Sequence, residues 1–357
     1  MRKVGNIWAY LSILVVIGIF LIAFFVKAIA FQSEINTSEQ VIRKPNKPAN
    51  QISLIFGGDA MLARTVEQKI LAADDWSLPF RKIAKEFKNA DLAFANLESP
   101  FYDKGSATPN GSTVFRALPK TINGLKSAGI DIVSLANNHF GDQGIAGEKY
   151  TFVHLTDNKI KYCGAGNNSN EAHSSVIFEV KKIKIAYLCY AYPETMSVAG
   201  ENNPGIANMD IEQMKKDVED LTQDADFVVV SMHAGTEYAH KPGVSQINFA
   251  RSAIDSGADL VIGHHPHVVQ TTEQYKDGYI IYSLGNLVFD QMWSEETQQG
   301  VVAKVNLVGD KIEKIEFKPI RIFDYNQPDW ADESEVSAIL GDMGLESANV
   351  TLSTVEE

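Results

Sequence analysis

Cysteine and basic residues are both scarce in this chain of 357 residues. The only cysteines are Cys163 and Cys189, which excludes a disulfide-built scaffold and a zinc finger made of cysteines. The two are able to pair, but nothing in the sequence requires a bond, and we expect small, buried, apolar side chains instead. Lysine and arginine number 32 against 45 acidic residues. A chain without a basic excess lacks the footprint of a general nucleic-acid binder, so we predict no nucleic-acid partner.

Charge is absent from one long segment, Ile7 to Val26. As a helix, this run would be about 30 Å long, the thickness of the hydrocarbon core of a bilayer. Arg2 and Lys3 precede it, so the positive-inside rule predicts a cytoplasmic N-terminus and an extracytoplasmic main domain. The alternative is a signal peptide cleaved after Ala28-Ile29-Ala30, although the apolar core of a signal peptide is usually about 7 to 15 residues. We favour an uncleaved, single-pass anchor in the cell membrane.

Composition divides the chain into four regions. Residues 1–30 are expected to be a cytoplasmic stub and transmembrane anchor; they carry +3, which leaves −16 on the rest of a chain whose total charge is −13. Residues 31–50 are polar, contain two prolines and are typical of a linker. We expect one folded domain over 51–325. Residues 326–357 form an acidic C-terminal tail with at most a short helix.

Short apolar runs alternate with amphipathic, helix-like segments in the folded region. This alternation is typical of βαβ units around a mostly parallel sheet. Two stretches, 176–190 and 301–320, instead predict hairpins with Lys-Lys and Gly-Asp at their turns. The predicted fold class is therefore α/β, with a mixed sheet or two sheets. The predicted strands are 52–56, 92–95, 132–135, 227–230, 260–262 and 280–284.

Polar side chains follow each predicted strand. Five of the eight histidines lie in three of these places. In open α/β sheets, ligands bind outside the carboxyl ends of the strands, so we expect these side chains to share one crevice. They are Asp59, Asn96, Glu98, Asn138, His139, His233, Glu237, His265, His267 and Asn286.

His265-Pro266-His267 is the motif most specific for a metal site. Alternate residues of an extended segment face the same side, and proline restrains the residue before it to an extended conformation. Both imidazoles are thus expected to converge on one cation or on a pair, and imidazole suits zinc, manganese or iron. His264 would point the other way, and we leave it out of the site.

Four other residues are candidate metal ligands. Asp59 follows two glycines that permit a tight turn, although an aspartate here also suits a helix N-cap. Glu98 supplies a carboxylate able to bridge two cations. Asn138 offers a neutral amide oxygen, with turn formation as the alternative. His233 ends a strand in a polar loop. The expected cofactor is one or two divalent ions.

Three further residues are assigned roles beside the metal. His139, next to Asn138, is the candidate general acid, with Asp142 orienting it. Arg64 and Arg116 lie near the first two strand ends and are candidate substrate-binding residues, because a guanidinium grips phosphate or carboxylate with two hydrogen bonds. An ordinary surface arginine is the alternative for both.

The motifs GGDAMLAR, FANLESP, SLANNHFGDQG, SMHAGTEY, GHHPHVVQ and YSLGNLVFDQ occur in this order between about Ile52 and about Ile322. The set resembles the CapA (poly-γ-glutamate capsule synthesis, PgsA-like) family, which is related to calcineurin-like metallophosphoesterases. The resemblance implies a four-layer α/β/β/α sandwich with a dinuclear metal centre at the sheet ends. It also implies that Asp59 binds one metal and Asn138 the second.

The resemblance assigns the remaining roles as well. It implies that His139 is catalytic and that His233, His265 and His267 are metal ligands. Two positions depart from the phosphoesterase pattern. Met61 stands where a second histidine is expected, and Glu98 replaces a bridging aspartate.

The expected function is synthesis or export of an anionic capsule polymer of the poly-γ-glutamate type, by a membrane-anchored protein with a metal-dependent, hydrolase-like site. Partners would be the membrane, the polymer or a phosphoester substrate, and subunits of a membrane synthase or exporter. Two alternatives stay open. One is a general extracytoplasmic metallophosphoesterase, and the other is a non-catalytic accessory subunit of a polymer synthase.

Overall fold

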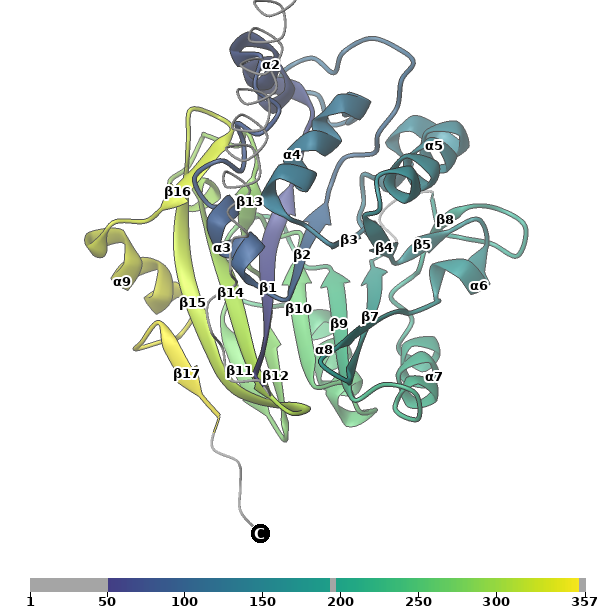
Figure 1. The fold of residues 1–357 in the computed structure, drawn as a ribbon, viewed down its shortest axis with the longest axis vertical. Helices are drawn as coiled ribbons and strands as arrows, with labels where there is room; N and C mark the ends of the chain where they lie inside the picture. The colour runs from purple at the N-terminus through teal and green to yellow at the C-terminus, as the bar shows by residue number, and fades with distance from the viewer. Residues whose placement is uncertain (1–50, 193–196, 353–357) are drawn as a thin grey trace, which may run out of the picture. The chain divides into compact units, whose positions relative to one another are not determined.

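Two β-sheets pack face to face in the computed structural model, which describes residues 51–192 and 197–352 (Figure 1). Helices and mixed sheets together confirm the predicted α/β class. The predicted transmembrane segment Ile7–Val26 and linker 31–50 lie outside the described residues. Within the described part of the chain, no helix is both long enough and apolar enough to cross a membrane.

The larger sheet has nine strands, in the order β16-β15-β14-β1-β2-β3-β4, with β13 beside β1 and β17 beside β15. β1 pairs in parallel with β2 and β13, and β2, β3 and β4 continue in parallel, whereas β14 to β17 pair antiparallel. The strands are β1 (Gln51–Ala60), β2 (Leu92–Leu97), β3 (Ile132–Ser134), β4 (Lys161–Cys163), β13 (Asn286–Val288), β14 (Gln299–Val308), β15 (Lys311–Phe323), β16 (Gln327–Trp330) and β17 (Asn349–Thr351).

The smaller sheet has six strands, in the order β11-β12-β10-β9-β7-β6, and its four central strands are parallel. Its strands are β6 (Val176–Val180), β7 (Ile183–Ala191), β9 (Phe227–His233), β10 (Leu260–His264), β11 (Thr272–Tyr275) and β12 (Gly278–Ile281). A separate two-stranded ribbon joins β5 (Ala165–Gly166) to β8 (Gly205–Ile206). The predicted hairpins are confirmed as β6–β7 and β14–β15.

The apolar core occupies both faces of the smaller sheet. Phe227 and Val229 of β9 face the larger sheet, while Val228 and Val230 face the helices on the other side. Both faces of β9 are therefore buried, which explains its continuous apolar run. The helices are α2 (Arg64–Ala73), α3 (Ala84–Asn89), α4 (Ile122–Ala128), α5 (Gly144–Asp157), α6 (Ser169–Ala172), α7 (Ile211–Leu221), α8 (Val244–Asp255) and α9 (Glu333–Asp342), with 3₁₀ turns η1 (Pro119–Thr121), η2 (Phe140–Gln143) and η3 (Glu296–Gln298).

The helices lie on the outer sides of the two sheets (Figure 1). α3 packs on β2 and α9 on β15, whereas α8 packs on β10 and β12, with α7 beside it. Between the sheets, Phe94 of β2 stacks on Tyr187 of β7 with ring centroids 5.8 Å apart. Aromatic rings thus fill the space between the sheets and fix one sheet against the other.

An aspartate just before each of four parallel strands ties that strand to its neighbour. In each case the Oδ2 atom accepts the backbone N–H of a residue in the adjacent strand. The pairs are Asp91 with Ser53 (2.9 Å), Asp131 with Ala93 (2.9 Å), Asp226 with Lys184 (2.7 Å) and Asp259 with Val228 (2.8 Å). These contacts fix the register at the strand starts, so the carboxyl ends of the same strands align at the opposite edge.

The expectation of free, buried cysteines is wrong. Cys163 in β4 and Cys189 in β7 form a disulfide bond, with their Cα atoms 5.5 Å apart. The bond joins the larger sheet to the smaller one. The cysteines are 26 residues apart, and only the packing of the sheets brings them together.

Residues 327–351, predicted as an acidic tail, continue the folded domain. β16 and β17 both pair with β15, and Ile339, Leu340 and Met343 are buried in the core. The segment has weak apolar periodicity because each of its elements is short and buries only a few residues.

Candidate metal centre

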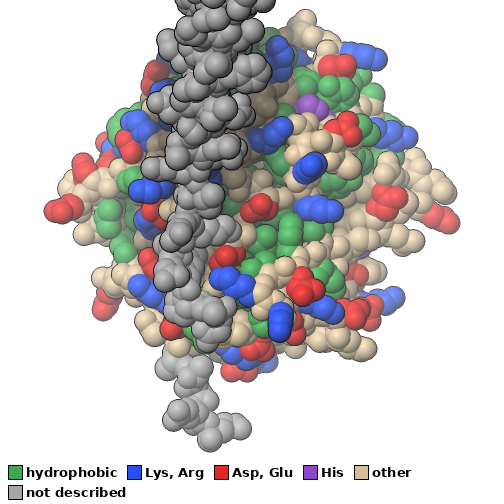
Figure 2. Space-filling model, in the orientation of Figure 1, with side chains coloured by type: hydrophobic (Ala, Val, Ile, Leu, Met, Phe, Trp, Pro, Cys, Tyr) green, Lys and Arg blue, Asp and Glu red, His purple; other side chains and the backbone are tan. Residues whose placement is uncertain are grey.

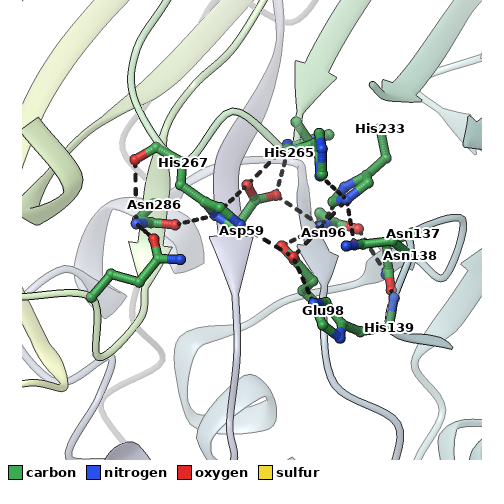
Figure 3. A network of polar contacts seen from close by, with 12 residues as sticks. Asp59, Asn96, Glu98, Asn137, Asn138, His139, His233, His265, His267 and Asn286 are labelled. Carbon is green, nitrogen blue, oxygen red and sulfur yellow. Dashed lines mark hydrogen bonds and ion pairs between the residues drawn. The ribbon is translucent and has the colours of Figure 1, made fainter. Parts of the chain in front are cut away.

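The predicted metal ligands meet at the carboxyl ends of strands from both sheets (Figure 3). Asp59 is the last residue but one of β1 and is in register with Asn96 of β2 and Asn286 of β13. In the smaller sheet, His233 of β9 is in register with His264 of β10. The loops after β2, β3 and β10 supply the remaining candidates, which are Glu98, Asn138, His265 and His267.

Gly58 is needed to bring Asp59 into this position. A Cβ atom on Gly58 would lie 1.9 Å from the carbonyl oxygen of Gly285, so no other residue fits there. The pairing of β1 with β2 is irregular between Phe56 and Asp59, and the Asp59 N–H donates to the same Gly285 oxygen at 3.0 Å. This close approach of two backbones is what the two glycines before Asp59 provide.

The Glu98 carboxylate lies at the centre of the cluster. Its Oε1 atom is buried and has no hydrogen-bond partner among the described residues. The Nε2 atom of His267 lies 3.6 Å away, and those of His139 and His233 lie 4.0 Å away. A buried oxygen without a hydrogen bond is costly unless a cation or donor satisfies it. A divalent cation among Asp59, Glu98 and His233, whose donor atoms all lie within 4.8 Å of one another, would do so.

His233 joins this group to the loops after β3 and β10. Its Nε2 atom lies 2.9 Å from Asn138 Oδ1 and 3.1 Å from His265 Nδ1. With metal–ligand bonds of about 2.0–2.2 Å, neighbouring ligands of one tetrahedral ion lie about 3 to 3.5 Å apart. The donor atoms present thus fit one or two divalent ions in both chemistry and spacing.

Burial controls the protonation of these groups. Burial lowers the pKa of His233 well below its usual value, with His265 adding to the effect, and lowers that of His267 to about 4. Both imidazoles are therefore neutral near pH 7 and keep a lone pair for a metal. Burial and then the Asp59 charge raise the pKa of Glu98. For Asp59, burial is outweighed by His264, His233 and His267, which hold its pKa below the usual range.

His139 is fixed beside the metal ligands. Its Nδ1 atom lies 2.8 Å from Asp142 Oδ2, the contact predicted for Asp142, and its ring stacks on Phe115 with centroids 3.8 Å apart. This leaves Nε2 directed toward Glu98. The ring is held from one edge and one face, as a positioned proton donor requires.

His265 and His267 converge for a different reason from the one predicted. Their φ angles are 98° and 58°, so the segment is not extended. A tight loop turns both imidazoles inward, with ring centroids 6.0 Å apart. The expectation that alternation in an extended segment aligns these side chains is therefore wrong, although the side chains do meet.

Four further residues of the site were not predicted as metal ligands or catalytic groups. His264, expected to point away, is buried with Nδ1 3.3 Å from Asp59 Oδ1. Asn96 donates to Asp59 Oδ1 at 2.8 Å, and Asn286 Oδ1 lies 3.0 Å from His267 Nδ1. Asn137 donates to the Leu97 carbonyl at 2.9 Å. Their positions after strands were the only signal in the sequence.

Both predicted substrate-binding arginines form contacts with other residues of the chain. Arg64 is buried, forms an ion pair with Asp290, and lies 4.6 Å over the ring of Phe115. Arg116 is buried too and donates to the carbonyls of Ser106 at 2.8 Å and Tyr102 at 3.1 Å. These contacts organise the loop that carries Phe115. A role for either arginine in substrate binding stays a prediction.

A cavity of about 720 Å³ opens beside the cluster, lined by Asn138, Gly141, Asp142, Gly144, Ile145, Glu148, Ser197, Val198, Asn203 and Pro204. Asn138 and Asp142 link it to the candidate ligands and to His139. The cavity is large enough for a small molecule or a few units of a chain.

Comparison with known proteins gives consistent results. A family model described as bacterial capsule synthesis protein PGA_cap matches residues 53–291. The chain is 32% identical over 276 residues to the capsule biosynthesis protein CapA of Bacillus anthracis, covering 75% of this chain and 67% of that protein. It is 31% identical over 274 residues to the PGA biosynthesis protein CapA of Bacillus subtilis, covering 76% and 72%. Among solved structures, a 5'-nucleotidase precursor from Thermus thermophilus aligns with a TM-score of 0.47 at 10% identity, over 82% of this chain and 58% of that one.

Proposed function

The chain belongs to the bacterial capsule synthesis protein PGA_cap family, and from that premise we propose that it serves the synthesis or export of an anionic capsule polymer of the poly-γ-glutamate type. It does so through a divalent-metal site at the sheet ends, in an α/β/β/α sandwich of the metallophosphoesterase kind. The layers described above support this sandwich, because helices lie on the outer side of each sheet.

The observation that carries the metal site is the buried Oε1 atom of Glu98, which has no hydrogen-bond partner in the described part of the chain. Asp59, Glu98, Asn138, His233, His265 and His267 are the residues that would hold one or two ions of the manganese, iron or zinc type. When bound, such ions polarise the target oxygen and lower the pKa of a coordinated water to about 7. His139, oriented by Asp142, would protonate the leaving group.

A polymer or phosphoester substrate would enter by the cavity beside Asn138. On the face shown in Figure 2, acidic and basic side chains are interspersed rather than separated by sign. Because the chain after residue 30 carries a net charge of −16, attraction for an anionic polymer would have to come from the cations of the site, acting over a short range. The polymer would then be recognised at the metal site and not by the charge of the whole surface.

We further propose that the domain works outside the cytoplasm, attached to the cell membrane by residues 1–30. The disulfide between Cys163 and Cys189 supports an oxidising compartment, because cytosolic thiols are normally kept reduced. Partners in the membrane would be subunits of a polymer synthase or exporter.

Metal content tests the site directly. Full-length protein, purified in detergent and refilled with Mn²⁺, is compared with Asp59→Ala and His265→Ala by elemental analysis. Glu212→Gln, an exposed acidic residue on α7, is the control. We expect wild-type content in the control and at least one equivalent less in the two site variants. Equal stoichiometry in all four proteins would contradict the ligand set.

Catalysis is tested separately from metal binding. A His267→Ala protein that folds and still supports polymer formation, while showing no Mn²⁺-dependent hydrolysis of bis(p-nitrophenyl) phosphate, would favour an accessory role. Loss of both polymer and hydrolysis would favour the enzymatic one.

A further inference from the structure

Glu237 lies beside the metal centre, on the loop between β9 and α8. One of its carboxylate oxygens and one nitrogen each of His265 and His267 all lie within 4.8 Å of one another. Glu237 is exposed, whereas Asp59, Glu98 and His233 are all buried. The described residues therefore contain two donor groups, one open to solvent and one enclosed.

Three hydrogen bonds hold the loop of Glu237 against the segment from His264 to Gln270. The Ala234 N–H donates to the His264 carbonyl at 3.1 Å, and the Tyr238 N–H donates to the Pro266 carbonyl at 2.8 Å. Beyond them, the Gln270 side chain donates to the Ala239 carbonyl at 2.6 Å. Glu237 thus lies between two fixed points of the loop, so its backbone is held beside the two histidines.

The backbone of both loops adopts conformations that are uncommon in proteins. Tyr238 has a φ of 63°, in the left-handed region, like His265 and His267. Residues other than glycine take this conformation rarely, and they keep it at sites where the surroundings fix them. Gly235 has a φ of 123°, and a Cβ there would lie 2.7 Å from the Gln246 side chain.

The side chains have the chemistry of a metal position that is open on one side. Two imidazoles and one carboxylate form a common ligand set for an ion that keeps a place for water or substrate. The Tyr238 hydroxyl hydrogen-bonds the neighbouring Glu237 carboxylate. This contact orients the carboxylate, as groups next to metal ligands commonly do.

We propose that Glu237 is a further metal ligand, which forms with His265 and His267 the solvent-facing position of the centre, beside the buried position of Asp59, Glu98 and His233. This inference rests on the proposed metal site. It predicts two metal positions that differ in exchange rate and in contact with water. The buried ion exchanges slowly, and the solvent-facing ion exchanges rapidly and contacts bulk water.

The test is a titration of metal-free, full-length protein with Mn²⁺ alone. Bound ion is counted by electron paramagnetic resonance, and contact with water is followed by proton relaxation. Wild type, Glu237→Gln, Asp59→Ala and the control Glu212→Gln are compared, with circular dichroism confirming the fold. We expect two equivalents in wild type and control. In Glu237→Gln we expect one equivalent to weaken at least tenfold, and it should be the one that relaxes water protons more strongly.

Each other outcome has a definite meaning. Wild-type stoichiometry and affinities in Glu237→Gln would overturn the inference, even if hydrolysis were lost. A single equivalent that depends on Asp59 but not on Glu237 would overturn it while leaving the proposed metal site intact. No binding by the wild type would contradict both. As a positive check, Glu237→Asp, which keeps the carboxylate on a shorter side chain, should recover part of the lost affinity.

Discussion

Glu98 Oε1 and His267 Nε2 lie 3.6 Å apart in the protein interior, and that oxygen has no hydrogen-bond partner among the described residues. Asp59 lies on the same side, with Oδ2 3.5 Å from the other ring nitrogen of His267. Two carboxylates and an imidazole buried together are unfavourable unless a cation binds between them. Metal affinity and the stability of the folded protein should therefore both depend on this pair of residues.

Metal affinity should rise with pH. The pKa of Glu98 is raised by burial and then by the Asp59 charge, so the metal-free protein holds a proton there that a cation must displace. Affinity therefore falls as pH falls through the raised pKa. The check is Mn²⁺ titration from pH 5 to 8. Glu98→Gln, which keeps the shape but cannot ionise, should bind more weakly and with a flatter pH dependence; an equally steep dependence would assign the proton to another group.

Removal of metal should lower thermal stability. An ion that binds only the folded state stabilises it by about 2.7 kcal/mol at 100 times its Kd. Scanning calorimetry with excess Mn²⁺ and then with chelator should show a lower Tm in the chelator for wild type. Asp59→Ala should show a smaller difference. A wild-type Tm unchanged by chelator would argue against a bound ion.

His139 should act in proton transfer without holding the metal. Asp142 and Phe115 fix its ring, and its Nε2 atom is directed toward the cluster. His139→Asn is expected to lower kcat for Mn²⁺-dependent hydrolysis of bis(p-nitrophenyl) phosphate by about 10²–10⁴-fold, with unchanged metal content. Asp142→Asn should have the smaller effect, because the asparagine oxygen can still orient the ring. Loss of metal in His139→Asn would make it a ligand instead.

The disulfide should contribute to stability. Cys163 and Cys189 are 26 residues apart, and closing a loop of that size stabilises a protein by about 3.5 kcal/mol in the chain-entropy model. The double variant Cys163→Ser/Cys189→Ser is compared with wild type by urea unfolding, with and without reductant. Wild type should lose stability in reductant and the variant should not. A variant as stable as the oxidised wild type would contradict this.

Asp259 should make stability fall as pH rises. Burial raises its folded pKa to about 6, above an ordinary value of 3.8, so the folded state binds more protons between these values. The contribution is fully present below about pH 4 and is lost as pH rises through 6, a change of about 2–3 kcal/mol. Asp259→Asn keeps an acceptor for the Val228 N–H. It should gain stability over wild type at pH 7 but not at pH 4.

The control for this prediction is Asp226→Asn, which alters the equivalent contact to Lys184 at a more exposed place. Its difference from wild type should change less between the two pH values. A change as large as that of Asp259→Asn would assign the effect to charge removal in general.

Apolar periodicity in the sequence was enough for β1, β2, β3, β9, β10, β12 and the two hairpins, but not for short strands such as β4 and β17. A strand buried on both faces must be apolar throughout, as β9 is, and polar chemistry at a parallel strand end must lie at one edge of its sheet. Asp59, His233 and the histidines after β10 were identified in this way. The predicted membrane segment Ile7–Val26 rests on the sequence alone, since it lies outside the described residues.

Tertiary structure alone decided the contacts between segments distant in the chain. The Cys163–Cys189 bond and the pairing of β17 with β15 depend on how sheets and strands meet in space. The same holds for His264 behind Asp59. The physical reason is that periodicity records which side chains are buried, whereas partners are set by register, loop conformation and the packing of one sheet on the other.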